Sequence, residues 1–159
     1  MTTRDASPSD AARIAEIYNQ GIEDRIATFE TRPRSAADVE QWFDGAHPVV
    51  VVEDGGSILG FASTSTYRPR DCYAGIAEFS VYVAREARRR GAGAVAMNAL
   101  MEAAKRAGCW KLLSRVFPHN LASLGLLQSL GFRRVGVYEK HGQLDGVWLD
   151  VVIVEKLLL

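Results

Sequence analysis

The segment Arg88-Arg89-Arg90-Gly91-Ala92-Gly93 is the feature that most constrains what this chain can fold into. It follows an alternating apolar run that ends at Val83, and it precedes apolar residues at helical spacing. A glycine-bearing turn at the start of a helix presents backbone N–H groups and the positive end of the helix dipole, and both attract phosphate. The segment therefore predicts a strand, a phosphate-binding loop and a helix, in that order. The alternative is a solvated arginine cluster in front of an ordinary helix.

Two common nucleotide-binding motifs do not fit this loop. The loop lacks the first glycine of the G-x-G-x-x-G fingerprint, and no Lys-Ser or Lys-Thr pair follows as in a Walker loop. These departures disfavour NAD and ATP as ligands.

Composition and charge exclude several classes of protein. The chain has 159 residues, the size of one domain, and we expect a single domain over residues 1–159. The 19 Lys and Arg balance 19 Asp and Glu, which disfavours nucleic acid and anionic membrane as partners. The two Cys and three His have no metal-ligand spacing, so we expect neither a metal nor a disulfide framework. No apolar run is long enough to cross a bilayer, and we expect a cytoplasmic protein.

Helix and strand signals alternate along the chain. Ser7-Pro8-Ser9-Asp10 and Ser35 with Asp38 are typical helix starts, and Gly108 and Gly131 stand where helices commonly end. With a first strand before them, the order of elements predicts an α/β architecture, a mixed sheet with helices on its faces. The other predicted strands are residues 48–53, 58–66, 76–83, 111–117, 133–138 and 147–156.

The predicted strand 76–83 alternates clearly between its two faces. Phe79 and Val81 point to one face, while Glu78 and Tyr82 point to the other. Glu78 and Tyr82 are therefore expected side by side on one face of the sheet.

A second motif lies downstream of the loop. Asn120 opens a predicted helix directly after a strand, and Leu130-Gly131-Phe132 ends that helix before another strand. Together with Arg88-x-x-Gly91-x-Gly93, this motif resembles the signature of the GNAT superfamily of N-acetyltransferases. Further segments are similar to its phosphinothricin acetyltransferase-like branch, which neighbours the arsinothricin-resistance enzymes: Ile17-Tyr18-Asn19, Thr28-Phe29-Glu30, Tyr67-Arg68-Pro69-Arg70, Glu78-Phe79-Ser80-Val81-Tyr82-Val83 and Trp148-Leu149-Asp150-Val151.

The resemblance implies a fold and an activity. The fold is the α/β (α+β) GNAT fold, a mixed, mostly antiparallel sheet of about seven strands with about four helices on both faces. The activity is transfer of acetyl from acetyl-CoA to the α-amino group of a small acceptor such as phosphinothricin, methionine sulfoximine or arsinothricin. A homodimer is expected, and resistance to such toxic amino acids is the role that the branch suggests.

The resemblance also implies which residues hold acetyl-CoA. Asn120 and Ser123 would bind the pantetheine arm by hydrogen bonds; the alternative is that Asn120 caps its helix, and one side chain can do both. Backbone amides of a strand would orient the pantetheine and the acetyl carbonyl, namely those of Val81, Tyr82 and Val83. The pyrophosphate would lie on the loop and the start of its helix, at Arg88, Arg89, Arg90, Gly91, Ala92, Gly93 and Ala94.

Two catalytic residues are expected on the strand. An ammonium group is no nucleophile until it loses a proton, so direct transfer from a thioester needs a base near the attacking nitrogen. Glu78 matches the acidic residue of the branch and is the expected base at the acceptor site; the alternative is an exposed carboxylate or an ion-pair partner. Tyr82 is the second expected catalytic residue.

Four further residues are expected around the acceptor. Arg68 and Arg70 are spaced to point to one side of an extended segment, where two guanidinium groups would bind an acidic acceptor; a solvated loop is the alternative. Phe29 and Glu30 would wall the acceptor site, with core packing as the alternative for Phe29.

One position departs from the family pattern. Many members carry Tyr, and close relatives His, four residues before the Gly-Phe pair, where this chain has Leu127. The thiolate then leaves unprotonated, or Tyr82, Tyr138 or His141 protonates it, or activity is weak. Acceptor selection is expected near residues 139–146.

Two other functions remain open from the sequence. One is acetylation of protein N-termini or lysines, and the other is an acyl-CoA-sensing domain that has lost transfer activity. Arg68 and Arg70 argue against a peptide acceptor, whereas Leu127 favours and Glu78 disfavours the sensor.

Overall fold

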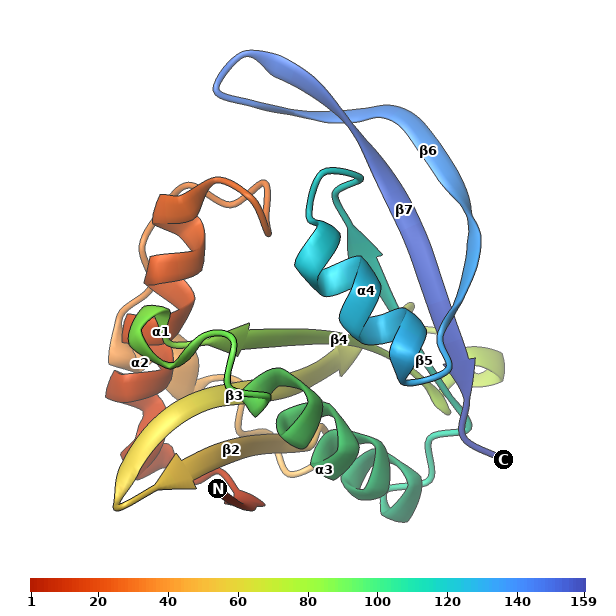
Figure 1. The fold of residues 1–159 in the computed structure, drawn as a ribbon. Coiled ribbons are helices and arrows are strands. Elements are labelled where there is room, and N and C mark those ends of the chain that lie inside the picture. The colour runs from red at the N-terminus through yellow and green to blue at the C-terminus, as the bar shows by residue number, and fades with distance from the viewer.

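The computed structural model describes residues 1–159 as one seven-stranded sheet with helices packed against it (Figure 1). The strand order is β1-β2-β3-β4-β5-β7-β6, and only the β4–β5 pair is parallel. The predicted mixed, mostly antiparallel fold is thereby confirmed. The elements are β1 Thr2–Asp5, α1 Ala11–Asp24, α2 Ala36–Glu40, β2 Val49–Asp54, β3 Ser57–Thr66, β4 Ile76–Val83, α3 Ala92–Arg106, β5 Lys111–Val116, α4 Leu121–Ser129, β6 Arg133–Leu144 and β7 Val147–Leu157, with short 3-10 turns at Pro8–Asp10, Asp71–Tyr73 and Arg85–Ala87.

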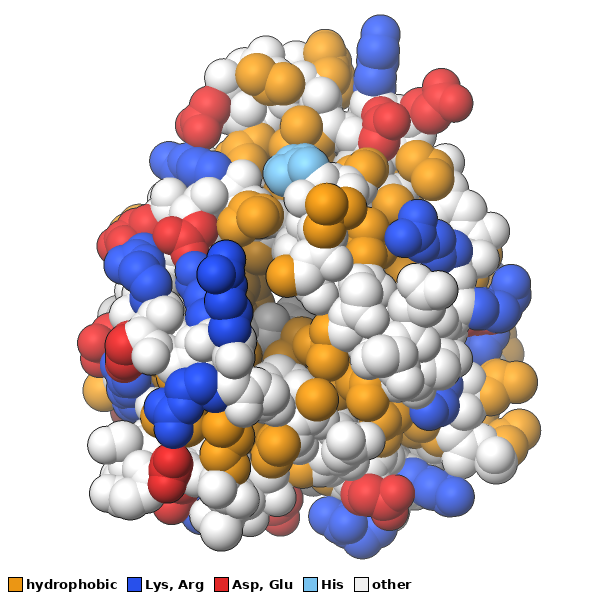
Figure 2. Space-filling view, viewed as in Figure 1, with side chains coloured by type: hydrophobic (Ala, Val, Ile, Leu, Met, Phe, Trp, Pro, Cys, Tyr) orange, Lys and Arg blue, Asp and Glu red, His pale blue; other side chains and the backbone are white.

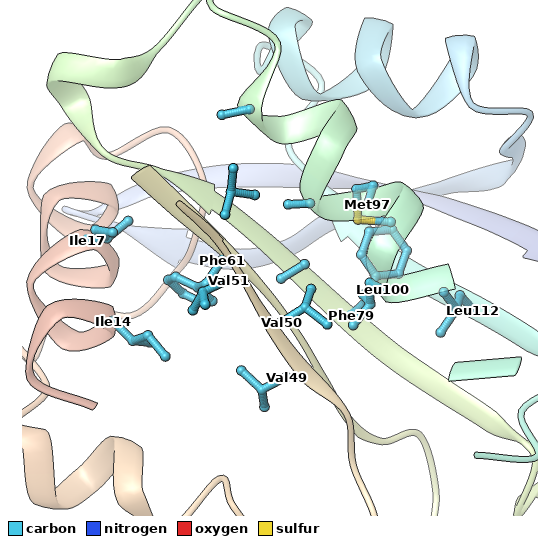
Figure 3. Packing of buried hydrophobic residues seen from close by; sticks show 14 of the residues in the cluster. Ile14, Ile17, Val49, Val50, Val51, Phe61, Phe79, Met97, Leu100 and Leu112 are labelled. Atoms are coloured by element: carbon cyan, nitrogen blue, oxygen red, sulfur yellow. The ribbon is translucent and has the colours of Figure 1, made fainter. Parts of the chain in front are cut away.

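The core lies on both sides of the central strands (Figure 3). The valine run 49–52 of β2 is buried throughout, as expected for a strand covered on both faces. Ile14 and Ile17 of α1 and Met97 and Leu100 of α3 are completely buried. Their helical spacing in the sequence explains why one stripe of each helix packs against the sheet.

The parallel strands β4 and β5 pair along only part of their length. Their register runs from Ile76 opposite Lys111 to Glu78 opposite Leu113, and no pair follows although both strands continue. The two strands therefore separate at the centre of the sheet. This separation creates the space in which the candidate site lies.

The β6–β7 hairpin is longer than the sequence predicts and extends beyond the other strands (Figure 1). Residues 139–144, expected outside the strand 133–138, continue β6 after an irregularity between Tyr138 and Gly142. The prediction missed that a strand can resume after a bulge. The hairpin closes at Asp145 and Gly146, which both have positive φ, as a tight two-residue turn requires.

None of the helices has the length and apolar character needed to span a membrane.

Candidate active site

A cavity of about 600 Å³ lies where β4 and β5 separate. Figure 2 shows a hollow on this face, with Lys and Arg side chains along one rim. Segments far apart in the sequence line it: β4, β5, the start of α3, α4, and the end of α1 with the loop after it. It gathers most residues predicted to bind a cofactor, namely Val81, Tyr82, Val83, Arg88, Arg89, Gly91, Gly93, Ala94, Asn120 and Ser123.

The edge of β4 is open to this cavity. Beyond Glu78, the β5 side of β4 has no strand partner, and the Ser114 hydroxyl donates a hydrogen bond to the Phe79 carbonyl at 2.9 Å where the strands part. Backbone polar groups at such an edge need partners from water or a ligand. An extended molecule with amide groups, such as a pantetheine arm, can therefore pair with β4.

The start of α3 fits a phosphate group. Gly91 caps the helix with φ of 85°, a conformation that glycine adopts without strain. A Cβ on Gly93 would lie 3.1 Å from Leu126 of α4, so glycine lets the two helices approach closely at the cavity. Gly93 and Ala94 belong to the first turn, whose N–H groups have no partner within the helix. The residues present thus suit a pyrophosphate at the helix N-terminus.

An acidic residue that the sequence analysis did not identify forms an ion pair with the first arginine of this loop, Arg88. Asp24, the last residue of α1, lines the cavity and forms ion pairs with Arg88 at 2.6 Å and Arg85 at 3.0 Å. Burial raises the pKa of Asp24, but the hydrogen bonds from the two arginines outweigh it, and the net pKa lies below the usual value. A carboxylate at a helix C-terminus opposes the helix dipole, which is the sequence signal that could have identified it.

Two residues of the predicted loop do not line the cavity. Arg90 forms an ion pair with Asp54 at 3.1 Å, and Ala92 is buried in the core. Their part in binding a cofactor stays a prediction that rests on their backbone amides.

Asn120 caps its helix at the cavity wall. Its side-chain oxygen accepts a hydrogen bond from the Ser123 N–H at 3.2 Å, and both residues line the cavity. Asn120 thus makes the capping contact of its alternative reading, and its contact with the pantetheine arm stays a prediction.

The predicted base has a partner that the sequence did not identify. Glu78 accepts a hydrogen bond from Arg115 at 3.1 Å, and Arg115 lines the cavity whereas Glu78 lies just outside its lining. Glu78 thus makes the ion pair of its alternative reading, and its role as the base stays a prediction. Arg115 and Glu78 lie on neighbouring strands where β4 and β5 begin to separate, so their contact depends on the parallel register rather than on local spacing.

Tyr82 is packed among aromatic side chains and lines the cavity. Its ring lies 5.6 Å from that of Phe61 and 5.0 Å from that of Tyr18, centroid to centroid. A Cβ on Gly21 of α1 would overlap this ring, so glycine there makes room for Tyr82. Burial raises the pKa of Tyr82 well above its usual value, and its hydroxyl therefore stays protonated at neutral pH.

The residues predicted to bind the acceptor lie outside the cavity lining. Arg68 and Arg70 lie beyond the end of β3, their guanidinium groups over the rings of Tyr67 and Tyr73. Phe29 packs edge-on against Phe117 at 4.8 Å, and Glu30 pairs with Arg34. Phe29 thus makes the packing contact of its alternative reading, and the acceptor roles of all four residues stay predictions.

The position expected to hold a proton donor is apolar. Leu127 is buried and lines the cavity. Of the three proposed replacements, Tyr82 lines the cavity, whereas Tyr138 and His141 stack on each other on β6, outside the lining.

No group of three or more His, Cys, Asp or Glu side chains could hold a metal ion.

The chain is similar in sequence and in fold to known acetyltransferases. Residues 14–132 match the model of the "Acetyltransferase (GNAT) family". The chain is 34% identical over 157 residues to an L-methionine sulfoximine/L-methionine sulfone acetyltransferase of Pseudomonas paraeruginosa, covering 96% of this chain and 91% of the relative. A putative acetyltransferase from Salmonella typhimurium, solved with its cofactor acetyl-CoA, superposes with a TM-score of 0.95 at 30% identity, covering 100% of this chain and 94% of the other. A phosphinothricin acetyltransferase from Sinorhizobium meliloti in complex with acetyl-CoA superposes with a TM-score of 0.90 at 30% identity, covering 98% of this chain and 87% of the other.

Proposed function

Because the chain belongs to the acetyltransferase (GNAT) family and is an acetyl-CoA-dependent N-acetyltransferase, we propose that it acetylates the α-amino group of small amino-acid-like acceptors by direct attack. The acceptors proposed are of the methionine sulfoximine, phosphinothricin or arsinothricin type. The observation that supports the proposal is the cavity between β4 and β5, which is lined by the loop before α3, by Tyr82 and by Arg115. The guanidinium of Arg115 donates a hydrogen bond to Glu78.

The proposed mechanism assigns each proton to a side chain. Acetyl-CoA supplies an acetyl thioester when bound. Glu78 takes one proton from the acceptor's ammonium and passes it to solvent. As the N–C bond forms and the C–S bond breaks, Tyr82 donates its proton to the leaving sulfur. The second proton lost by the nitrogen replaces the one that Tyr82 gave, so the products are the N-acetyl acceptor, a thiol and one proton.

Tyr82 as the acid leads to a first prediction. Tyr82→Phe removes the hydroxyl and keeps the ring that packs on Phe61, so kcat should fall by about 10- to 100-fold with little change in the KM for acetyl-CoA. The measurement is initial-rate thiol release. Tyr18→Phe, in the same aromatic cluster but outside the cavity lining, should keep kcat. An equal rate for Tyr82→Phe and wild type would remove Tyr82 as the acid.

For the acceptor side we propose four residues that lie outside the cavity lining. We propose that Arg68 and Arg70 hold an acidic side group, such as a phosphinate, because guanidinium groups bind such anions bidentately. Phe29 and Glu30 would wall the site from the loop between α1 and α2.

An acceptor panel tests the proposed substrate class. Thiol release from acetyl-CoA is followed with methionine sulfoximine, phosphinothricin, arsinothricin, ordinary amino acids, polyamines and a peptide, each against a blank without acceptor, and products are weighed by mass spectrometry. Saturable release with one of the first three supports the proposal. Preference for the peptide would favour a protein acetyltransferase, and acetyl-CoA binding without any release would favour a sensor.

We also propose that the chain forms a homodimer through the β6–β7 hairpin. β6 is an edge strand of the sheet, and apolar side chains on the hairpin are about half exposed, an arrangement typical of a contact surface. These side chains are Val135, Val137, Tyr138, Val147 and Trp148.

The dimer leads to a second prediction. Trp148→Glu places a charge among these apolar side chains, and we expect a monomer by light scattering at concentrations where the wild type is a dimer. Leu121→Glu makes a similar change on an exposed side chain of α4 and should leave the dimer intact. A wild type that is monomeric at every concentration would contradict the proposal.

The cytoplasmic location expected from the sequence stays a prediction.

A further inference from the structure

Arg115 is a cavity-lining cation to which the predicted site assigned no task. Of the other arginines in the lining, Arg88 is paired with Asp24, and Arg89 belongs to the loop before α3 that is predicted to bind the pyrophosphate. Arg115 lies instead on β5, in the part of that strand that has separated from β4. Its position therefore suits a ligand other than the pyrophosphate.

Most N–H donors of the Arg115 guanidinium have no hydrogen-bond partner in the protein. Its only side-chain hydrogen bond or ion pair is the one to Glu78 at 3.1 Å, and its side chain is 53% exposed. A guanidinium has five N–H donors in a planar fork that matches a carboxylate. Arg115 can therefore bind a second carboxylate while it stays close to Glu78.

We propose that Arg115 binds the α-carboxylate of the acceptor and that the Arg115–Glu78 pair forms the recognition site for a free α-amino acid. An α-amino acid carries an ammonium and a carboxylate about 3 Å apart, and the paired atoms of Arg115 and Glu78 are 3.1 Å apart with opposite charges. The amino acid can therefore lie antiparallel to the ion pair, with its carboxylate on Arg115 and its ammonium on Glu78. The inference rests on the proposed amino-acid acetyltransferase function and names the group that defines its substrate class.

This docking has a chemical consequence. With the carboxylate on Arg115, the ammonium lies against the carboxylate that is to take its proton, so one contact selects the substrate and positions the nitrogen. An amine or amino-acid amide lacks the group that Arg115 binds. Arg68 and Arg70 would act separately, on an acidic side group where the acceptor has one.

The test compares an acid with its amide. Methionine sulfoximine and its α-carboxamide have the same amine and the same neutral side chain, so their ratio of kcat/KM isolates the carboxylate. In Arg115→Gln this acid-to-amide preference should fall by about 30- to 100-fold, mainly through the KM of the acid. Any effect of Arg115→Gln on Glu78 as the base changes kcat/KM for both acceptors equally, so it cancels in the acid-to-amide ratio. Arg115→Lys should retain part of the preference.

Two controls separate this effect from loss of structure. Arg133→Gln breaks a similar ion pair, with Glu155 on β7, outside the cavity and should leave the preference unchanged. The double variant Arg68→Gln/Arg70→Gln should weaken phosphinothricin relative to methionine sulfoximine and leave the acid-to-amide preference intact. The KM for acetyl-CoA should stay constant in Arg115→Gln.

Calorimetric titration of the CoA-saturated protein with the same acid and amide gives a readout that needs no turnover. Tighter binding of the acid, lost in Arg115→Gln, supports the inference even if no acceptor is acetylated, in which case the proposed function alone fails. Equal binding and turnover of acid and amide by the wild type, or an unchanged preference in Arg115→Gln, would overturn it.

Discussion

Replacing Glu78 by glutamine is expected to lower kcat by about 100- to 10,000-fold at neutral pH and to leave acetyl-CoA binding intact. Glutamine keeps the size of the side chain and a hydrogen-bond acceptor for Arg115, but it cannot take a proton from the acceptor's ammonium. The deficit should shrink as the pH rises, because a growing fraction of the acceptor is then already the free amine. The measurement is the pH profile of kcat for wild type and variant.

A matched carboxylate controls for the general effect of removing a negative charge from an ion pair. Glu155 on β7 pairs with Arg133 and Lys111 and lies outside the cavity lining, so Glu155→Gln should keep the wild-type kcat. If Glu78→Gln turns over at the wild-type rate across the pH range, Glu78 is not the base and the ion pair with Arg115 has another role.

A glutamate in place of Ala94 is expected to weaken acetyl-CoA binding by about 10- to 100-fold without loss of stability. Ala94 lies in the first turn of α3 and lines the cavity, so the new carboxylate would repel the pyrophosphate at its proposed site. The same position favours an acidic side chain through the helix dipole, and the melting temperature should hold. Calorimetric titration with CoA measures the affinity.

The control for Ala94→Glu carries the same charge one turn further along. Asn98→Glu lies on the exposed side of α3 and outside the cavity lining, and it should bind CoA as the wild type does. Equal affinities for wild type and Ala94→Glu would show that the pyrophosphate does not bind at the start of α3.

Local sequence signals predicted the parts of the site that depend on local structure. The strand 76–83 was placed correctly because its apolar residues alternate, and the loop before α3 because glycines, a preceding strand and a following helical stripe occur together. Asn120 was identified because capping residues mark the start of a helix. These features depend on neighbouring residues, and their physics can be read along the chain.

Contacts between distant segments were beyond the same reasoning. The ion pairs of Arg115 with Glu78 and of Asp24 with Arg88 join residues on different elements, and only the register of β5 and the packing of α1 bring them together. Arg90 was assigned with its neighbours although its side chain pairs with Asp54. A sequence indicates the type of a side chain, whereas its direction depends on the whole fold.

Two-substrate kinetics with product analysis test the central claim most directly. Thiol release is measured while acetyl-CoA and methionine sulfoximine are varied together, and the site of acetylation is read from the product. We predict intersecting double-reciprocal lines and acetylation of the α-nitrogen, as expected for direct attack in a ternary complex. Parallel lines, which indicate an acetylated enzyme, or no acceptor-dependent thiol release would contradict it.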